Sequence, residues 1–474
     1  MRSPFKGHPA GRAYRRVVPV ALLGATLLAA ALLPTTAGAW RDRAMANMSA
    51  TTTRVAWTPQ FTRLAGTSIA LGDDGSLAIW GYRGNGLSGT GVADVPAGDP
   101  ITVIGLPGRR AAVKVAGTSP DASTMDDPDR IALAALAEDG NVYTWGGNQT
   151  NHLMGRSGDF TKPGQVSIPD PVADLVSTSA AFIALTETGD VYTWGYGNGH
   201  GETGQGSADG SEPTPKRILT GIHSIAAGMW NGWAIKQGTG YWWGWANAGA
   251  LASDPSGDHA FYTAYAPGQS GFLTRRSASC AGVGFRMGEP GDPCPIKRLT
   301  GHTFGTQMLY ANGEVYTWGS YYDFGIGRSQ SGQDYPTEVS IPVPIVDIVP
   351  TSDYVMLLGA DQTVYSFGRY SWAGGPDPSS GRLSYTNMSR DQVTRWSQLA
   401  GGVVALGANG FTGHALYDDN TIYSWGGGDE SQTSGGAVRN NLYAAVRDGF
   451  ATNSVATNQG AGRTGLAFPG SGAP

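Results

Sequence analysis

The sequence predicts an all-β fold, a β-propeller of seven blades with four strands in each blade. One pattern, a glycine-containing turn followed by β-prone residues and a closing aromatic-Gly pair, recurs seven times. Three of the six steps between successive copies are 49 residues long, and a tryptophan signature at this spacing is typical of propellers. The chain of 474 residues contains 72 Gly and 28 Pro but only 15% charged residues, which indicates many turns between short strands.

The third copy, Gly189-Asp190-Val191-Tyr192-Thr193-Trp194-Gly195, shows how each unit is expected to fold. The Gly-Asp pair predicts a tight turn, and the next four residues predict a strand whose side chains alternate between two faces. The glycine after the tryptophan permits a bulge or the close approach of another backbone. Aromatic residues that recur at one register are predicted to form the core between blades; they are Trp80, Trp145, Trp194, Trp243, Trp318, Phe367 and Trp425.

Each unit supplies four predicted strands. Two form the hairpin, one precedes it, as at residues 222–228, and one follows the Trp-Gly loop, as at residues 215–219. No stretch after the N-terminal apolar run shows sustained helical periodicity. In chain order, the hairpins are predicted at residues 68–81, 135–146, 184–195, 234–244, 308–319, 361–368 and 415–426.

The ring is expected to be closed by strands from both termini, because a propeller must hide the edges of its first and last blades. The first unit lacks the long segment that precedes the third and fourth hairpins. Residues 454–468 resemble residues 224–235 but have no Trp-Gly after them, and residues 59–64 resemble the last strand of a unit with no beginning. We expect these two ends to meet.

The N-terminus has the features of a secretory signal peptide over residues 1–39. Basic residues precede an apolar run at residues 17–33, and Ala37-Gly38-Ala39 has the small-x-small pattern that signal peptidase cleaves. A membrane anchor is the alternative, and Arg15-Arg16 leaves the Sec and twin-arginine routes both open. We expect cleavage before Trp40, a flexible leader over residues 40–51, the propeller over 52–468 and a flexible tail over 469–474.

The repeat resembles a known family. The pattern Ala-Leu-x-x-x-Gly-x-Val-Tyr-x-Trp-Gly-x-Asn, complete in the second unit through Asn148, is similar to the regulator of chromosome condensation repeat, and the resemblance covers residues 61–426. It implies a seven-bladed propeller that binds other proteins. The nuclear members of the family act on chromatin and as guanine-nucleotide exchange factors for a small GTPase. This chain instead carries an export signal, lacks a basic tail and is acidic overall, so exchange activity is not expected.

Composition and motifs exclude several classes of function. A net charge of −5 and a pI near 5.8 offer no basic surface for nucleic acid or anionic membrane. The sequence has no Gly-x-Ser-x-Gly, His-Glu-x-x-His, P-loop or Rossmann motif, and its seven histidines show no metal-ligand spacing. The acidic run at residues 121–129 lacks EF-hand spacing and is interpreted as a solvated loop. We therefore expect no catalytic residues, no cofactor and no metal, although acidic residues from several blades could converge at the central channel of a hydrolase or lyase.

The two cysteines, Cys280 and Cys294, lie in one Gly/Pro-rich stretch. In an exported protein a disulfide between them is expected, and it would stabilise the fold by about 3 kcal/mol in the chain-entropy model. Two free thiols are the alternative.

Aromatic and arginine residues that do not recur are the candidates for partner binding, because such side chains commonly anchor protein interfaces. They cluster in the loops after the fourth, fifth and sixth Trp-Gly pairs, including a predicted insertion at residues 246–295. The candidates are Trp245, Phe261, Tyr262, Tyr265, Arg275, Arg276, Tyr321, Tyr322, Phe324, Tyr370 and Trp372. The insertion could instead fold back on its own blade.

We therefore predict a secreted or envelope-located, monomeric and non-enzymatic propeller that binds an extracellular or envelope protein. No nucleic acid and no membrane insertion after signal cleavage are expected. The alternative is a propeller that binds carbohydrate such as a cell-wall glycan, because sugars also stack on exposed aromatic rings.

Overall fold

The computed structural model describes twenty segments of the chain, and all of them belong to one compact unit, Thr36–Pro474. Within these segments no helix combines the length and the apolar character that crossing a membrane requires. The described residues are 57–64, 66–95, 102–118, 131–147, 152–196, 200–206, 212–236, 239–246, 262–270, 295–302, 305–319, 326–327, 336–352, 354–369, 375–376, 383–384, 389–410, 412–419, 421–426 and 443–444.

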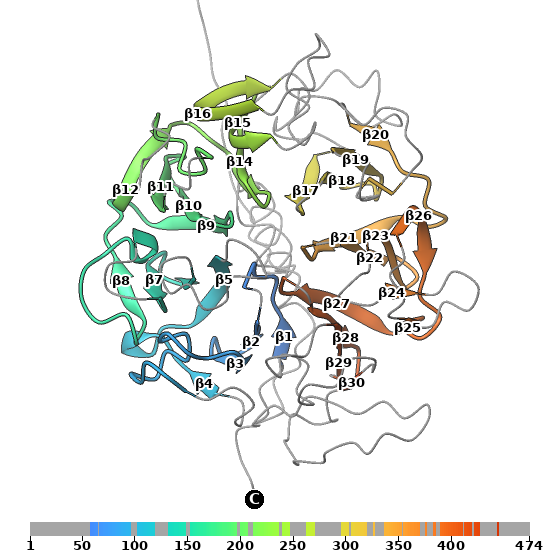
Figure 1. The fold of residues 1–474 in the computed structure, drawn as a ribbon, viewed down its shortest axis with the longest axis horizontal. Helices are drawn as coiled ribbons and strands as arrows, with labels where there is room; N and C mark the ends of the chain where they lie inside the picture. Colours follow the sequence, from blue (N-terminus) through green and yellow to red (C-terminus); the bar gives the residue numbers. More distant parts are fainter. Residues whose placement is uncertain are drawn as a thin grey trace, which may run out of the picture. The chain divides into compact units, whose positions relative to one another are not determined.

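The strands form seven four-stranded antiparallel sheets, which are the blades of a propeller (Figure 1). The prediction of a seven-bladed all-β propeller is therefore confirmed. The first blade consists of β1(Trp57–Pro59), β2(Thr67–Gly72), β3(Leu77–Gly81) and β4(Thr102–Ile104), and the second of β5(Ala112–Thr118), β6(Ala132–Ala137), β7(Val142–Trp145) and β8(Gly164–Val166). The third consists of β9(Val172–Ser177), β10(Ala181–Thr186), β11(Val191–Gly195) and β12(Glu212–Leu219), and the fourth of β13(Ser224–Ala227), β14(Asn231–Lys236), β15(Thr239–Ala246) and β16(Tyr262–Ser270).

The last three blades follow the same plan, with a small hairpin added to the sixth. The fifth blade consists of β17(Ile296–Gly301), β18(Gly305–Tyr310), β19(Val315–Gly319) and β20(Thr337–Glu338). The sixth consists of β21(Ile345–Pro350), β22(Tyr354–Gly359), β23(Val364–Arg369) and β26(Ser389–Arg395). The seventh consists of β27(Val403–Ala408), β28(Thr412–Tyr417), β29(Ile422–Gly426) and β30(Tyr443–Ala444). The added hairpin is β24(Gly375–Pro376) with β25(Leu383–Ser384), and two short 3-10 helices are η1(Pro107–Arg109) and η2(His152–Met154).

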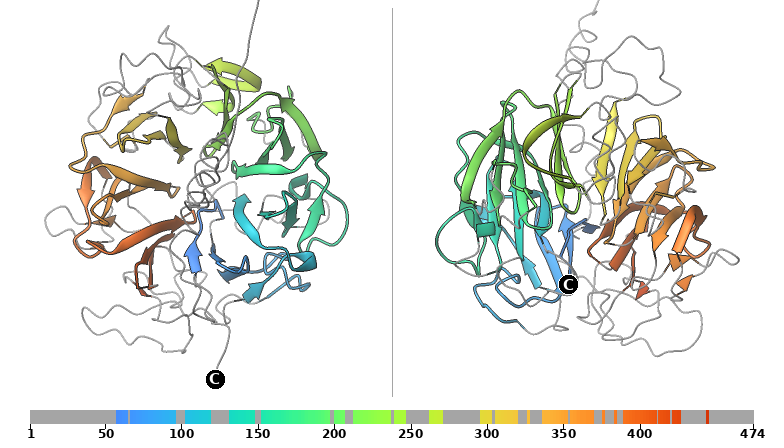
Figure 2. Two further views of the ribbon diagram at one scale, coloured as in Figure 1. Left: turned by 180° about the vertical axis from the view of Figure 1, so that it is seen from behind. Right: turned by 45° about the horizontal axis from the view of Figure 1, so that its top comes forward.

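The first strand of each blade lies innermost, next to the first strand of a neighbouring blade. Contacts run from β5 to β9, β13, β17, β21 and β27 in turn (Figures 1 and 2). The first blade closes the ring, because β1 contacts β27 and β2 contacts β5. Because the strands of a blade alternate in direction, the loops after the first and third strands emerge on one side of the ring. We call this side the loop face; the hairpin turns between the second and third strands emerge on the opposite face.

The recurring aromatic residues are buried between blades. All seven are at most 2% exposed. The indole N–H of Trp194 donates to the backbone carbonyl of Leu153 in the preceding blade at 3.0 Å, while the hydroxyl of Thr193 donates to Thr203 O at 2.6 Å within its own blade. Each Thr-Trp pair of this kind therefore ties together the loops of two adjacent blades.

The glycine that follows the tryptophan allows a close backbone approach. Gly195 has φ +146°, and a Cβ atom built there would lie 2.4 Å from the carbonyl oxygen of Ala180. Any side chain would therefore push β10 and β11 apart, which explains why the pattern closes on glycine.

The first blade is completed by a strand that precedes its hairpin. Trp57–Pro59 pairs with β2 as the innermost strand, so the interpretation of residues 59–64 as an outermost strand is wrong. The residues after β1 instead bind the seventh blade, where Thr62 N donates to Ala408 O at 2.8 Å and Gly410 N donates to Leu64 O at 3.0 Å. Residues 454–468 lie outside the described residues, so closure by a C-terminal strand stays a prediction, which deletion of the chain after Phe450 would test by lowering the melting temperature.

Part of the predicted insertion belongs to the fourth blade itself. β16 pairs along β15, with Ala246 opposite Tyr262 and Gly240 opposite Ser270. A segment that sequence spacing marks as extra therefore contains the outermost strand of this blade, and its removal would damage the sheet.

Candidate functional site

The structure describes only three of the predicted partner-binding residues. Trp245 lies half-buried at the end of β15, and Tyr262 and Tyr265 lie in β16. The remaining candidates and both cysteines lie outside the described residues; they are Phe261, Arg275, Arg276, Tyr321, Tyr322, Phe324, Tyr370, Trp372, Cys280 and Cys294.

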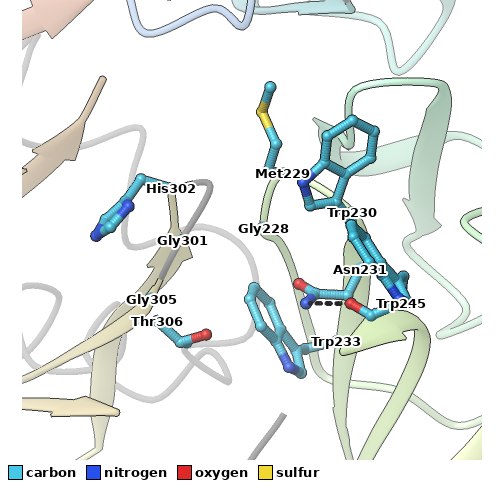
Figure 3. A pocket seen from close by; sticks show the side chains of 10 residues that line it. All are labelled: Gly228, Met229, Trp230, Asn231, Trp233, Trp245, Gly301, His302, Gly305 and Thr306. Carbon is cyan, nitrogen blue, oxygen red and sulfur yellow. Dashed lines mark hydrogen bonds between the residues drawn. The ribbon is translucent and has the colours of Figure 1, made fainter. Parts of the chain in front are cut away.

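Trp245 borders a recess on the loop face, between the fourth and fifth blades (Figure 3). We call it the aromatic recess. Its empty space is about 210 Å³ including open solvent, and the enclosed part has room for about one water molecule, so the recess is far smaller than a small-molecule site. The fourth blade contributes Gly228, Met229, Trp230, Asn231, Trp233 and Trp245, and the fifth contributes Gly301, His302, Gly305 and Thr306.

Three rings form a packed cluster at the edge of this recess. The imidazole of His200, from the loop after β11, stacks on Trp245 at 4.6 Å between centroids with an interplanar angle of 13°. Trp230 meets His200 edge-on at 5.2 Å and Trp245 edge-on at 5.8 Å. The side chain of His200 is 32% exposed and both tryptophans are half-buried, so the cluster presents apolar ring edges to solvent. The contacts among the three rings fix their relative orientation.

Two buried polar atoms of the recess have no hydrogen-bond partner among the described residues. One is the indole N–H of Trp230, and the other is Oδ1 of Asn231. The amide nitrogen of Asn231 is occupied, because it donates to Trp245 O at 3.2 Å (Figure 3). Buried polar groups are nearly always paired in native proteins, so a water molecule or a ligand group is expected to bind each of these two atoms.

A carboxylate lies buried beneath the ring cluster. Glu202 is fully buried, and its Oε1 lies 4.0 Å from Nδ1 of His200 and accepts a hydrogen bond from the hydroxyl of Ser179 at 3.4 Å. The hydroxyl thus donates to the carboxylate rather than to the imidazole that would activate a serine nucleophile. The backbone carbonyl of Glu202 also accepts the indole N–H of Trp243 at 2.9 Å, so this residue anchors the loop that carries His200.

The centre of the loop face holds one buried cation. The guanidinium of Arg63 is 5% exposed and donates to three backbone carbonyls from three consecutive blades: Ser177 at 2.8 Å, Ala227 at 2.8 Å and Gly301 at 3.2 Å. Burial lowers the pKa of Arg63 to about 9, which leaves the side chain charged at neutral pH. A second Nη1 contact reaches Sδ of Met229 at 3.8 Å, which connects this centre to the aromatic recess.

No group of three or more His, Cys, Asp or Glu side chains within the described segments could hold a metal ion. The acidic run at residues 121–129 lies outside them. The eight described residues that line the recess at Arg63 include no acidic one.

Sequence reasoning missed Trp230, His200 and Arg63. Trp230 stands in the loop after β13 where the third unit has Ala180, so comparison of the loops after the first strands would have found it. Arg63 leaves no such signal, because it occurs once and its partners are backbone carbonyls of distant segments.

The fold is similar to solved propellers of the regulator of chromosome condensation type. Human WBSCR16 superimposes with a TM-score of 0.55 at 16% identity, covering 74% of this chain and 83% of that chain. Yeast RCC1 (Prp20), in a structure with Kap60 bound, gives a TM-score of 0.55 at 17% identity over 75% of this chain and 80% of that chain. No protein-family model and no curated protein matches the sequence.

Proposed function

We propose that this chain is a protein-binding propeller whose partner docks on the loop face at the aromatic recess. The unpaired Trp230 N–H beside the unpaired Asn231 Oδ1 is the observation that carries the proposal. A peptide group or a side-chain amide supplies one acceptor and one donor, and so it could satisfy both atoms at once. The surrounding aromatic edges would supply the apolar burial on which protein interfaces depend.

Similarity of fold adds general support. Propellers of this type commonly bind proteins, and the yeast relative is seen with Kap60 bound. The low sequence identity carries no partner across to this chain, so the recess rather than the resemblance supports the assignment.

A glycan is the weaker candidate for the same face. Sugar rings stack on exposed aromatic faces, whereas one face of Trp245 is already covered by His200 at 4.6 Å. The geometry of the cluster therefore favours a partner that inserts beside the rings over one that stacks on Trp245.

We further propose that the chain acts outside the cell or at the cell envelope, on the strength of its signal-like residues 1–39. The N-terminal sequence of protein recovered from the culture medium tests this: a first residue of Trp40 supports export with cleavage, and an intact N-terminus retained inside cells contradicts it.

Capture experiments test the binding proposal. Immobilised protein is incubated with proteins of the culture medium and envelope, the captured protein is purified, and its affinity is measured for three variants. Trp230→Ala should weaken binding at least tenfold, as is common for a central aromatic anchor. Trp230→Phe keeps a ring but removes the N–H, so we expect an intermediate loss of about fivefold to tenfold.

The matched control is Val404→Ala. Val404 is an exposed apolar residue, 44% accessible, near the start of β27 and therefore toward the opposite face. Its truncation should leave binding unchanged. Equal affinities for wild type and Trp230→Ala, or retention of purified wall polysaccharide with no protein captured, would refute the proposal. Deletion of residues 246–295 is not a suitable test, because that change removes β16.

A further inference from the structure

We propose that Arg63, on the propeller axis and outside the lining of the aromatic recess, is a positioning residue for partner binding, because its guanidinium holds the two walls of the recess at a fixed separation. This inference rests on the proposed function and names a residue that controls the same site from a distance. One wall follows Ala227, the last residue of β13, and the other begins at Gly301, the last residue of β17. The two walls face each other across the recess (Figure 3).

The two arms of one guanidinium bind the two walls. Nη2 of Arg63 donates to the carbonyl of Ala227 at 2.8 Å, and Nη1 donates to the carbonyl of Gly301 at 3.2 Å. We call the guanidinium with these two bonds the Arg63 clamp. Nη1 also lies 3.8 Å from Sδ of Met229, which lines the recess. Because the guanidinium is planar and rigid, the clamp fixes the distance between the two carbonyls.

The clamp acts at the turns that carry the lining residues. Each bound carbonyl belongs to the residue before the turn between the first and second strands of its blade. In the fourth blade this turn is closed by Gly228 N, which donates to Asn231 O at 2.8 Å. In the fifth blade it is closed by His302 N, which donates to Gly305 O at 3.0 Å. Trp230 lies within the first of these turns, so the clamp holds the segment that presents its indole.

The two walls approach each other closely beside the clamp. A Cβ atom built on Gly301 would lie 3.2 Å from Cα of Gly228, which is tighter than most contacts of a real Cβ atom. A small shift of one blade against the other therefore changes the opening in which Trp230 Nε1 and Asn231 Oδ1 lie.

The clamp is itself anchored by other blades. Nε of Arg63 donates to Ser177 O of the third blade at 2.8 Å, and Arg63 N donates to Gly117 O of the second blade at 3.1 Å. Thr62 N donates to Ala408 O of the seventh blade at 2.8 Å. Arg63 is 5% exposed, so water competes little for these bonds. The guanidinium is therefore held independently of both walls, which allows it to position them.

Arg63→Lys tests the clamp, because one ammonium nitrogen keeps the positive charge but cannot reproduce the fork that binds both carbonyls. Amide hydrogen exchange of the free protein is measured at Gly228 and His302, one in each wall, well below the unfolding temperature of every variant. We expect both amides to exchange at least tenfold faster than in wild type. Trp145→Phe is the control, because it removes the bond to Leu87 O and destabilises the ring between the first and second blades. It should leave both amides as in wild type.

Affinity for the captured partner gives the second readout. Arg63→Lys should weaken binding about tenfold although Arg63 does not line the recess, and Trp145→Phe should bind as wild type does. The combined variant Arg63→Lys/Trp230→Ala should lose less than the product of the two single losses, because both changes act on one site. Gly301→Ala, whose added Cβ presses on Gly228, should also weaken binding and provides the same test if Arg63→Lys does not fold.

Three results would overturn the proposal. They are unchanged exchange of Gly228 and His302 in Arg63→Lys, unchanged partner affinity of Arg63→Lys when Trp230→Ala weakens binding, and single losses that multiply in the combined variant. Failure of the proposed function gives a different pattern, in which Trp230→Ala binds the partner as wild type does while the two amides of free Arg63→Lys still exchange faster. That pattern would retain Arg63 as the clamp of the walls and refute docking at the recess.

Discussion

The indole N–H of Trp194 donates to the backbone carbonyl of Leu153, 3.0 Å away in the preceding blade. The same bond joins Trp145 to Leu87 at 3.0 Å and Trp243 to Glu202 at 2.9 Å. At these three positions the recurring tryptophan is therefore a connector between blades as well as a core residue, whereas Trp425 donates to the hydroxyl of Tyr354 and Nε1 of Trp318 has no partner among the described residues.

Replacing this tryptophan should destabilise the propeller. Trp194→Phe removes the indole N–H that donates to the carbonyl of Leu153 and also removes part of a large buried side chain, so we expect the free energy of unfolding to fall by about 2 kcal/mol. Urea denaturation measures the change. Trp245→Phe, at a half-buried position, is the comparison and should cost less; equal losses at both positions would contradict a special role for the inter-blade bond.

Arg63 is expected to be the most sensitive single position along the axis. Arg63→Met removes the hydrogen-bond donor of three buried carbonyls on three blades. The variant no longer has the desolvation cost of a buried charge, but this gain offsets only part of the loss. We expect a decrease of about 2–4 kcal/mol in the free energy of unfolding. Arg217→Met, which breaks an ion pair with Asp190 on the exposed blade surface, should lower stability only slightly, and an equally small effect of Arg63→Met would show that the three bonds contribute little.

Acidification should weaken the joint between the seventh and first blades. The imidazole of His414 is bonded to Ser424 Oγ at 2.8 Å and to Ser68 Oγ at 3.1 Å, and burial lowers the pKa of His414 to about 3. The unfolded chain, with an ordinary histidine pKa near 6.5, binds a proton that the folded protein excludes. His414 should therefore reduce stability as the pH falls from about 6.5 toward 3, by at most about 1.4 kcal/mol per pH unit.

Denaturation of His414→Gln across this range checks the assignment. The variant should be less stable than wild type at pH 7, because two buried hydroxyls lose a matched partner, but its stability should fall less steeply below pH 6.5. Parallel pH profiles for the two proteins would show that the acid sensitivity arises elsewhere.

The two cysteines provide a further check on export. If Cys280 and Cys294 form the expected disulfide, thiol titration of the unreduced protein should find no reactive group, and reduction should lower the melting temperature. Two reactive thiols before reduction would contradict the disulfide.

The propeller fold could be predicted from the sequence because its structural unit recurs along the chain. Seven copies of the Trp-Gly pattern at a common spacing establish the blades, and the burial of Trp194 and its counterparts follows from their shared register. The innermost strand of the first blade was misjudged, because Trp57–Pro59 is short and carries no repeat signature.

The site was harder to predict for a physical reason. Binding residues vary between blades, so they lack the periodic signal that identifies the core. Trp245 was found from its aromatic character next to a Trp-Gly pair. Trp230 becomes its neighbour only through the pairing of strands within the fourth blade, and His200 only when the third and fourth blades pack side by side. Arg63 depends on contacts with residues more than one hundred positions away.

The central claim is that the loop face around Trp230 binds a partner protein. Amide hydrogen exchange of the propeller, with and without the captured protein, tests it most directly. We predict slower exchange at residues 200–206 and 228–231 in the complex, with no change at the hairpin turns 187–190 and 312–314 of the opposite face. Protection confined to those hairpin turns, with residues 200–206 and 228–231 unaffected, would contradict the account.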